Sequence, residues 1–163
     1  MPDTGELLAL ARSRVAAVAP ATDLEAMSVC FQLIRAADRI AGDLETVHRR
    51  IGWSWAGFRV VFWVWLLGPL EPRRIASLAS SSRASVSSVL NTLERDGHVV
   101  RRRVAGDRRL VKVELTERGA ALIVEAFRTQ NEREQAWAAA LTAEERETLI
   151  VLTGRLLDRA AEA

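Results

Sequence analysis

The sequence predicts a mainly α-helical protein with one small β-hairpin, and three observations support this fold class. Apolar residues recur at helical spacing along most of the 163 residues. Residues that can cap a helix precede these segments, and glycine or proline follows several of them. Residues 99–104 and 109–115 have β-rich character and flank the short segment 105–108. We therefore expect one pair of antiparallel strands among helices.

Two helices are expected in the first part of the chain. Thr22 and Glu25 have the spacing of a capping box, and the apolar residues that follow predict a helix over residues 24–51. Ser54 can cap a second helix over residues 55–67, whose second half is apolar on all faces. Because such a segment must be buried, this second helix is predicted to lie at the centre of the core.

A short helix and a longer one follow, joined by a serine-rich turn. Pro72 suits the first position of a helix over residues 72–79. Ser82 can cap a helix over residues 83–96, which Gly97 closes in the left-handed conformation. The inner stripe of that helix consists of Val86, Val89, Leu90 and Leu93. Short helix, turn, second helix and hairpin is the order of a winged helix-turn-helix.

Two further helices are expected at the C-terminal end. Thr116 can cap a helix over residues 117–138, and Thr142 with Glu145 forms a second capping box that opens a final helix. The predicted fold is a winged helix-turn-helix flanked by N- and C-terminal dimerisation helices. Its expected domains are the N-terminal helices (residues 1–50), the winged helix-turn-helix (residues 51–116) and the C-terminal helices (residues 117–163).

Charge is distributed unevenly along the chain. Residues 73–112 hold ten arginine or lysine residues and three acids, a balance of +7, whereas the whole chain carries +2. The rest therefore sums to −5. This asymmetry favours a basic module for a polyanion, and a solvated surface is the alternative interpretation.

Composition also excludes several classes of protein. The longest apolar run, residues 60–67, is too short for a membrane span, and residues 1–20 lack a signal-peptide core, so we expect a cytoplasmic protein. Cys30, His48 and His98 lack the spacing of metal ligands. No nucleophile stands with a base in a catalytic constellation. We expect neither an enzyme nor a bound metal or cofactor, which leaves a protein-binding winged helix as the main alternative to DNA binding.

Several segments resemble the MarR family of bacterial transcriptional regulators. GWSWAGFRVV at residues 52–61 resembles the family's GLTxxQFxVL segment. Residues 75–79 and 82–97 resemble its helix-turn-helix, which ends in LExxG. DRR at residues 107–109 and LTERG at residues 115–119 resemble its DxR wing and its LTxxG exit. Gly57 and His98 depart from the usual glutamine and leucine, and an extra stretch precedes Thr22. The resemblance implies a regulator that binds double-stranded DNA and usually represses transcription. Such a regulator is associated with the bacterial nucleoid when it is bound to DNA.

The resemblance also implies which residues contact DNA. The major-groove set comprises Ser82, Arg83, Ser85, Ser87 and Ser88. Asp107 would brace Arg109 so that its guanidinium extends into the minor groove, with Arg108 at the tip of the wing. Arg101 and Arg103 are expected to contact phosphates.

A homodimer is implied as well, because a two-fold pair of recognition helices about 34 Å apart reads a palindrome. Apolar residues near both ends of the chain have little domain to be buried against, although packing within one subunit is the alternative. The predicted interface consists of Leu7, Leu8, Leu10, Val15, Val18, Leu141, Leu149, Ile150, Leu152, Leu156 and Leu157. For the N-terminal stretch, the sequence permits a helix over residues 6–18.

Members of this family commonly bind small phenolic or carboxylic compounds between the dimerisation helices and the DNA-binding part. Aromatic walls with a guanidinium suit such a ligand, and core packing is the alternative role of the same side chains. The candidate effector-binding residues are Phe31, Arg35, Trp53, Trp55, Phe58, Arg59 and Phe62.

Cys30 suggests an alternative signal. VCFQL at residues 29–33 resembles the segment that carries the reactive cysteine in hydroperoxide-sensing members of the family. Those proteins activate the thiol with hydrogen bonds from tyrosines, but this chain contains no tyrosine, and Ile34 stands where one is expected. We therefore expect Cys30 to be an inert core residue, with peroxide sensing as the alternative.

Overall fold

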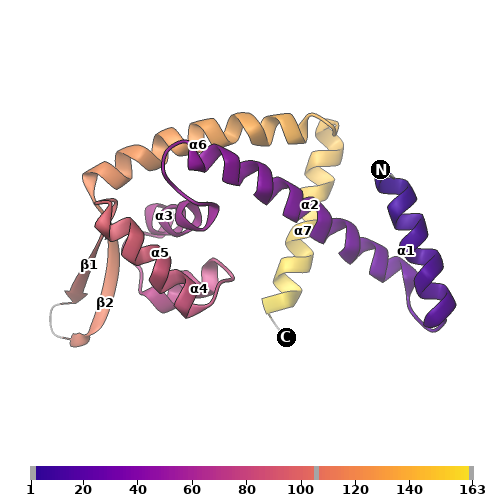
Figure 1. The fold of residues 1–163 in the computed structure, drawn as a ribbon, viewed down its shortest axis with the longest axis horizontal. Coiled ribbons are helices and arrows are strands. Elements are labelled where there is room, and N and C mark those ends of the chain that lie inside the picture. The colour runs from indigo at the N-terminus through magenta and orange to yellow at the C-terminus, as the bar shows by residue number, and fades with distance from the viewer. Residues whose placement is uncertain (1–2, 105–106, 162–163) are drawn as a thin grey trace. The chain divides into compact units, whose positions relative to one another are not determined.

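The structure is a computed structural model that describes residues 3–104 and 107–161, and the side chains of residues 3–103 and 110–159. The described chain contains seven α-helices and two β-strands (Figure 1). They are α1 (Thr4–Val18), α2 (Leu24–Arg49), α3 (Trp55–Leu67), α4 (Pro72–Leu78), α5 (Arg83–Arg95), β1 (Val99–Val104), β2 (Asp107–Leu115), α6 (Glu117–Ala138) and α7 (Ala143–Ala161). These elements form two compact units, Met1–Glu45 and Thr46–Ala163. The prediction of a mainly helical protein with one hairpin is confirmed.

The N-terminal unit contains α1 and most of α2. Asp3 and Glu6 cap α1 reciprocally, each carboxylate accepting the other residue's backbone N–H at 2.8 Å. Arg12 of α1 donates through Nη1 to the carbonyl oxygen of Leu24 at 3.2 Å and to Oγ of Ser28 at 2.8 Å. These bonds join α1 to the first turn of α2, so the helix that the sequence permitted here is present.

The predicted capping box at the start of α2 is wrong by one residue. Asp23, and not Thr22, caps the helix: its Oδ1 accepts the backbone N–H groups of Glu25 and Ala26, both at 2.9 Å. An aspartate one position before the first helical residue can satisfy two free amides at once. The cap therefore follows from Asp23 alone, without a partner at Glu25.

The core of the second unit surrounds α3, as predicted. Phe58, Val60, Val61 and Val64 of α3 are each at most 3% exposed. The same core contains buried side chains from five other elements, namely Ile75 of α4, Leu90 of α5, Val99 of β1, Val113 of β2 and Ile123 of α6. Figure 1 shows α6 running from the base of the hairpin across α3. The expectation that the whole apolar second half of α3 is buried is wrong for its last turn, because Trp65, Leu66 and Leu67 are 44%, 51% and 52% exposed.

Helices α4 and α5 form the helix-turn-helix. Pro72 opens α4, and the hydroxyl oxygen of Ser82 caps α5 by accepting the backbone N–H of Ser85 at 3.0 Å. The predicted inner stripe of α5 is confirmed, with Val86, Leu90 and Leu93 buried and Val89 half-buried. Gly97 has φ of 75° and ends the helix in the left-handed conformation, as predicted.

Strands β1 and β2 form an antiparallel hairpin. Arg101 pairs with Val113, and after a register shift Val104 pairs with Asp107. This last pair extends the ladder, so β2 begins two residues earlier than predicted, and Asp107 belongs to the strand instead of the tip. On the other edge of β2, Leu70 donates its N–H to the carbonyl oxygen of Val113 at 3.1 Å and accepts from its N–H at 2.7 Å.

Thr116 joins the hairpin to α6 and to the end of α5. Its Oγ1 donates to the carbonyl oxygen of Gly97 at 2.7 Å and accepts the N–H of Gly119 at 3.0 Å. Its own N–H donates to the carbonyl oxygen of His98 at 3.1 Å. Through these bonds Thr116 connects the hairpin, the end of α5 and the start of α6. This explains the LTxxG pattern of the sequence in physical terms.

The C-terminal helices have the predicted starting points. Thr142 and Glu145 form the predicted capping box, with bonds of 2.8 and 3.2 Å between each side chain and the other residue's N–H. Apolar side chains of α7 are 44% to 72% exposed, namely Leu149, Ile150, Val151, Leu152, Leu156 and Leu157. Within the part of the chain that the structure describes, no helix combines the length and apolar character that a membrane span requires.

Candidate nucleic-acid interface

The outer face of α5 carries the predicted major-groove residues. Ser82, Arg83, Ser85, Ser87 and Ser88 are all exposed. They lie together because the apolar stripe of α5 faces α3 and leaves the hydroxyl side chains outside. Ser82 and Ser85 also bond to each other, with 2.8 Å between their Oγ atoms. Four of these five side chains are short serine hydroxyls that can form hydrogen bonds, so this face of α5 can come close to base edges.

Strand β1 places three consecutive arginines beside α5, and their environments differ. The Arg101 side chain is 26% exposed and forms an ion pair with Glu94 of α5 at 2.7 Å. The Arg102 side chain is 67% exposed and forms an ion pair with Glu114 of β2 at 3.0 Å. Arg103 is exposed. Because side chains alternate across a strand, Arg101 and Arg103 share one face of the hairpin and Arg102 takes the other.

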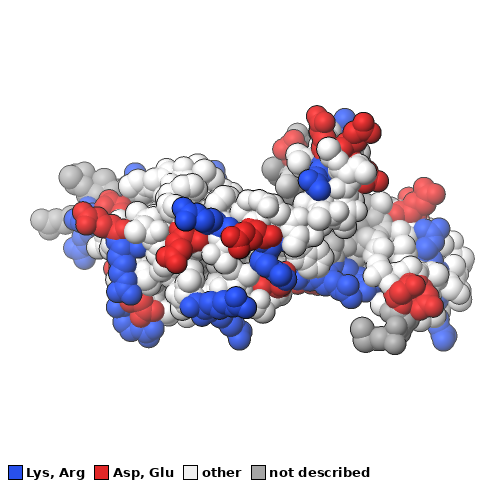
Figure 2. Space-filling view, turned by 90° about the horizontal axis from the view of Figure 1, so that it is seen from above, with Lys and Arg blue, Asp and Glu red and all other residues white. Residues whose placement is uncertain are grey.

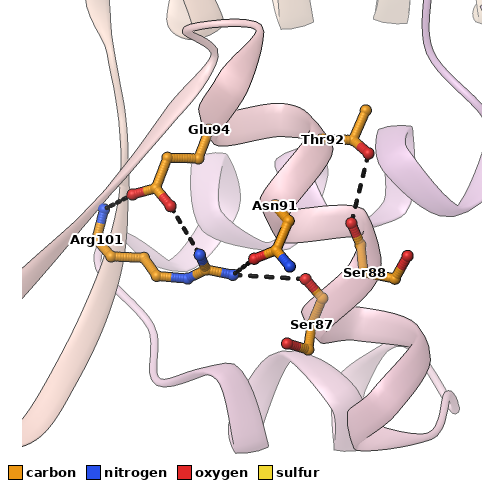
Figure 3. Close-up of polar contacts among 6 residues, drawn as sticks. All are labelled: Ser87, Ser88, Asn91, Thr92, Glu94 and Arg101. Atoms are coloured by element: carbon orange, nitrogen blue, oxygen red, sulfur yellow. Dashed lines mark hydrogen bonds and ion pairs between the residues drawn. The ribbon is translucent and has the colours of Figure 1, made fainter.

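Arg101 makes several bonds to α5 (Figure 3). Its Nη1 donates to Glu94 at 2.7 Å, and its Nη2 donates to Oδ1 of Asn91 at 2.9 Å. Its backbone N–H donates to the other carboxylate oxygen of Glu94 at 3.0 Å. The predicted phosphate contact of Arg101 stays a prediction, and these bonds compete with it. The exposed Arg103 has no such bond to α5 among the described side chains.

The predicted tip residues lie partly outside the described part of the structure. Asp107, Arg108 and Arg109 form the start of β2. Their side chains are among those outside the described residues, so the bracing of Arg109 by Asp107 stays a prediction.

Charge on the opposite side of the second unit is mixed. Figure 2 looks down onto α6 and shows acidic and basic side chains interspersed there. Residues 73–112, in contrast, hold the balance of +7. The basic excess thus belongs to the helix-turn-helix and the hairpin.

Three predicted effector residues lie in one row of aromatic rings. Trp55 and Phe58 have ring centroids 5.5 Å apart, and Phe58 and Phe62 follow at 5.9 Å. The row continues to Phe127 of α6, whose ring stacks on Phe62 at 6.2 Å, and begins at His48, 4.0 Å from Phe58. The aromatic row is defined here as His48, Trp55, Phe58, Phe62 and Phe127.

The other predicted effector residues lie elsewhere. Trp53 is 3% exposed and packs edge-on against His98, with 5.3 Å between ring centroids. Arg59 donates to the carbonyl oxygen of Ala79 in the turn of the helix-turn-helix. Phe31 and Arg35 belong to the N-terminal unit, where the Arg35 guanidinium lies 5.4 Å from the Phe31 ring centre. The structure therefore does not place Trp53 or Arg59 in the aromatic row.

Sequence reasoning missed the polar end of the aromatic row. His48 is fully buried, and its Nε2 lies 2.8 Å from Oε1 of Gln130, whose Nε2 donates to Glu134 at 2.5 Å. Gln130 continues the helical spacing of the buried residues Ile123 and Ala126 on α6. A polar residue at an apolar position was the available signal.

A small pocket lies where the start of α3 meets α5. Its volume is about 110 Å³, and Trp53, Gly57, Ser88, Thr92 and Asp96 contribute to its wall. Sites for drug-sized ligands usually measure about 300–1,000 Å³, so this pocket is too small for one.

The expectation that Cys30 is a core residue is wrong, because Cys30 is exposed on α2. Peroxide sensing stays a prediction. Among the described residues, no group of three His, Cys, Asp or Glu side chains could hold a metal ion.

A short helix, a tight turn, a second helix and an antiparallel hairpin packed on one core define a winged helix-turn-helix protein. The sequence profile of the MarR family matches residues 53–111. The HTH-type transcriptional regulator YwaE of Bacillus subtilis (strain 168) is 34% identical over 137 residues, which is 83% of this chain and 80% of that one. The chain therefore belongs to the MarR family, whose members are transcriptional regulators and not enzymes.

Other relatives agree with this assignment. The transcriptional repressor MprA of Escherichia coli (strain K12) is 32% identical over 91 residues, 55% of this chain and 51% of that one. The crystal structure of NadR in complex with 4-hydroxyphenylacetate has a TM-score of 0.68 at 26% identity and covers 78% of this chain and 91% of that one. The structure of the transcriptional regulator PA4135 has a TM-score of 0.73 at 26% identity, covering 79% and 95%.

Proposed function

We propose that this protein is a sequence-specific regulator that binds double-stranded DNA through α5 and the hairpin. One observation carries the proposal: the exposed hydroxyl face of α5 lies beside the arginine-bearing strand β1. Small hydroxyl side chains allow the helix to approach base edges, and arginines neutralise phosphates. A regulator of this kind acts at the bacterial nucleoid, in the cytoplasm.

Selection from a pool of random duplexes tests this function. We expect the retained duplexes to share a palindrome, because two recognition helices related by two-fold symmetry read inverted half-sites. The affinity for the selected duplex should fall log-linearly as the salt concentration rises, since binding releases counterions. A protein-binding winged helix would retain no common sequence and would show no steep salt dependence.

The proposed assembly is a homodimer held by the helices at both ends of the chain, residues 1–50 and 117–163. The exposed apolar side chains of α7 support it, because a single chain leaves Ile150 71% and Leu157 72% exposed. Two chains would bury these side chains and set the distance between the two copies of α5. Repression is the proposed sign of regulation, as the name of the relative MprA indicates for that protein.

A small aromatic compound is the proposed signal, and the aromatic row is its proposed site. Phe127 is 37% exposed and stands at one end, and the buried His48–Gln130 pair supplies polar atoms at the other. Flat rings with a few polar groups suit a phenolic ligand, and the structural relative NadR is named with 4-hydroxyphenylacetate bound.

Tryptophan fluorescence measures this binding directly, because Trp55 belongs to the aromatic row. We expect 4-hydroxyphenylacetate or a related phenolic acid to quench the emission with a saturating dose dependence and to release the selected duplex. Replacing Phe62 with leucine should weaken the quenching, whereas Trp53, outside the aromatic row, can be replaced by phenylalanine as the control. A flat response across a panel of phenolic acids would contradict the proposed signal.

A further inference from the structure

One carboxylate connects the recognition helix to the wing. Oε1 of Glu94 on α5 accepts the backbone N–H of Arg101 at 3.0 Å, and Oε2 accepts Nη1 of the same residue at 2.7 Å (Figure 3). Both oxygens are thus used by one residue of β1, through its main chain and its side chain. Charged bonds of this kind are shorter and stronger than neutral ones.

The guanidinium of Arg101 is held at a second place on α5. Its Nη2 donates to Oδ1 of Asn91 at 2.9 Å and lies 3.5 Å from the carbonyl oxygen of Ser87. Ser87, Asn91 and Glu94 are spaced by four and three residues, so they lie along one side of the helix. Figure 3 shows the side chain of Arg101 extended along this side.

This network is better shielded than an ordinary surface pair. The side chain of Arg101 is 26% exposed and that of Glu94 is 37% exposed. The ion pair between Arg102 and Glu114 provides a contrast, because its arginine is 67% exposed and both partners belong to the hairpin. The first pair joins the hairpin to α5, whereas the second joins the two strands within the hairpin.

We propose that Arg101 and Glu94 are positioning residues that fix the wing relative to the recognition helix, so that both reach their grooves of the duplex together. This inference rests on the proposed DNA binding. It gives Arg101 a role different from the phosphate contact that the sequence suggested. The wing cannot shift along α5 without breaking a main-chain bond and a guanidinium bond at once.

The direction in which Glu94→Gln changes the affinity for DNA distinguishes a positioning role from a purely electrostatic one. Glu94 is an acid close to the DNA-facing surface, so if charge alone mattered, Glu94→Gln would strengthen binding to a polyanion. Glutamine has nearly the same shape but a single acceptor oxygen, and its NH₂ group cannot accept from Nη1. If Glu94 positions the wing, Glu94→Gln should weaken binding, by about five- to thirty-fold.

Arg101→Lys distinguishes the roles at the other partner. A phosphate contact tolerates lysine because the positive charge is kept, but the compact ammonium group cannot bond Glu94 and Asn91 in the same fork geometry. Positioning therefore predicts a similar loss for Arg101→Lys and Glu94→Gln. It also predicts that the double variant loses little more than either single variant, since both changes remove one interaction.

The experiment measures binding of the full chain to its selected duplex at several salt concentrations. Glu114→Gln is the matched control, because it removes an acid from a wing ion pair without touching α5, and its affinity should be unchanged or higher. We expect the salt slope of Glu94→Gln to equal that of the wild type, whereas each lost phosphate contact would lower the slope by about one. Thermal unfolding checks that every variant is folded.

Hydrogen exchange of the Arg101 amide supplies a readout that needs no DNA. This amide donates to Glu94, so its exchange should become faster in Glu94→Ala, which removes both acceptor oxygens, and stay unchanged in Glu114→Gln. Equal or tighter binding by Glu94→Gln, or an unchanged exchange rate, overturns the positioning role and leaves the proposed function intact. A wild-type protein that retains no duplex from the random pool overturns both.

Discussion

The first turn of α6 passes so close to the main chain of His98, between α5 and β1, that residue 119 has no room for a side chain. A Cβ added to Gly119 would lie 2.9 Å from the carbonyl carbon of His98 and would overlap its oxygen. That oxygen also accepts the N–H of Thr116 and is held in place. The glycine of the LTxxG pattern is therefore required by a close approach of two main chains.

We predict that Gly119→Ala lowers the free energy of unfolding by about 1–3 kcal/mol, the usual cost of overpacking. Urea denaturation at neutral pH measures it. Gly42→Ala is the control, because a Cβ there meets nothing within 4 Å in the middle of α2. Alanine should stabilise that helix slightly. If the two variants unfold at the same urea concentration, the close approach at His98 does not constrain residue 119.

His98 makes stability depend on pH. Burial of its ring, followed by the positive charge of Arg118, lowers its pKa from the usual 6.5, although Asp96 acts in the opposite direction. The folded protein therefore binds this proton less readily than the unfolded chain does. The stabilising effect of the neutral ring is complete above pH 6.5 and is lost as the pH falls through the lower, folded pKa.

We expect the urea midpoint of the wild type to fall between pH 7.5 and pH 5. His98→Leu places an uncharged side chain of similar size beside Trp53, so its midpoint should change less over the same interval. The difference between the two proteins isolates the contribution of His98 from that of other groups. Identical pH profiles would show that the ring does not titrate differently in the folded and unfolded states.

The hairpin is the element in which an arginine side chain is expected to decide specificity. Arg109 belongs to β2 and is predicted to enter the minor groove. We predict that Arg109→Ala weakens binding to the selected duplex by about 1–3 kcal/mol. Arg128→Ala on the exposed surface of α6 is the control, since it removes the same charge far along the chain from the wing. Equal affinities of the two variants in a mobility-shift assay would reject the role of Arg109.

Elements with local signals were predictable from the sequence. Ser82, Gly97 and Thr116 marked helix ends because capping and left-handed closure depend on neighbouring residues only. Contacts between distant segments were not predictable in this way. The main-chain bonds between Leu70 and Val113 have no periodic pattern, and the network of Arg101 with Glu94 requires knowing how β1 packs on α5.

The candidate site shows the same division. The exposed serines of α5 followed from the spacing of its apolar stripe, whereas the partners of each arginine did not. Trp55, Phe58 and Phe62 lie in one row because they share a face of α3, which helical spacing predicts, and their role as effector residues stays a prediction. Trp53 lies before the helix begins, so helical spacing could not place it, and Phe127 arrives from α6 through tertiary packing.

At the scale of the whole molecule, the exposed apolar surface of α7 is typical of a protein–protein interaction surface. Leu149, Ile150 and Leu156 are between 44% and 71% exposed in the single chain. A second copy is the proposed partner, and it would also give the two-fold symmetry that a palindromic duplex requires. Oligomeric state and DNA affinity should therefore change together.

We predict that Ile150→Glu converts the dimer to a monomer, because a carboxylate in a buried apolar interface is costly to desolvate. Light scattering after size-exclusion chromatography measures the mass, and Ile150→Val, which keeps the apolar surface, should remain a dimer. The monomer presents one recognition helix at a time, so its affinity for the selected palindrome should fall by at least about a hundredfold, in line with the gain that linking two sites provides. Two results would contradict the link between α7 and DNA recognition. One is a wild-type protein that is monomeric at micromolar concentration. The other is an Ile150→Glu variant that binds the palindrome as tightly as Ile150→Val does.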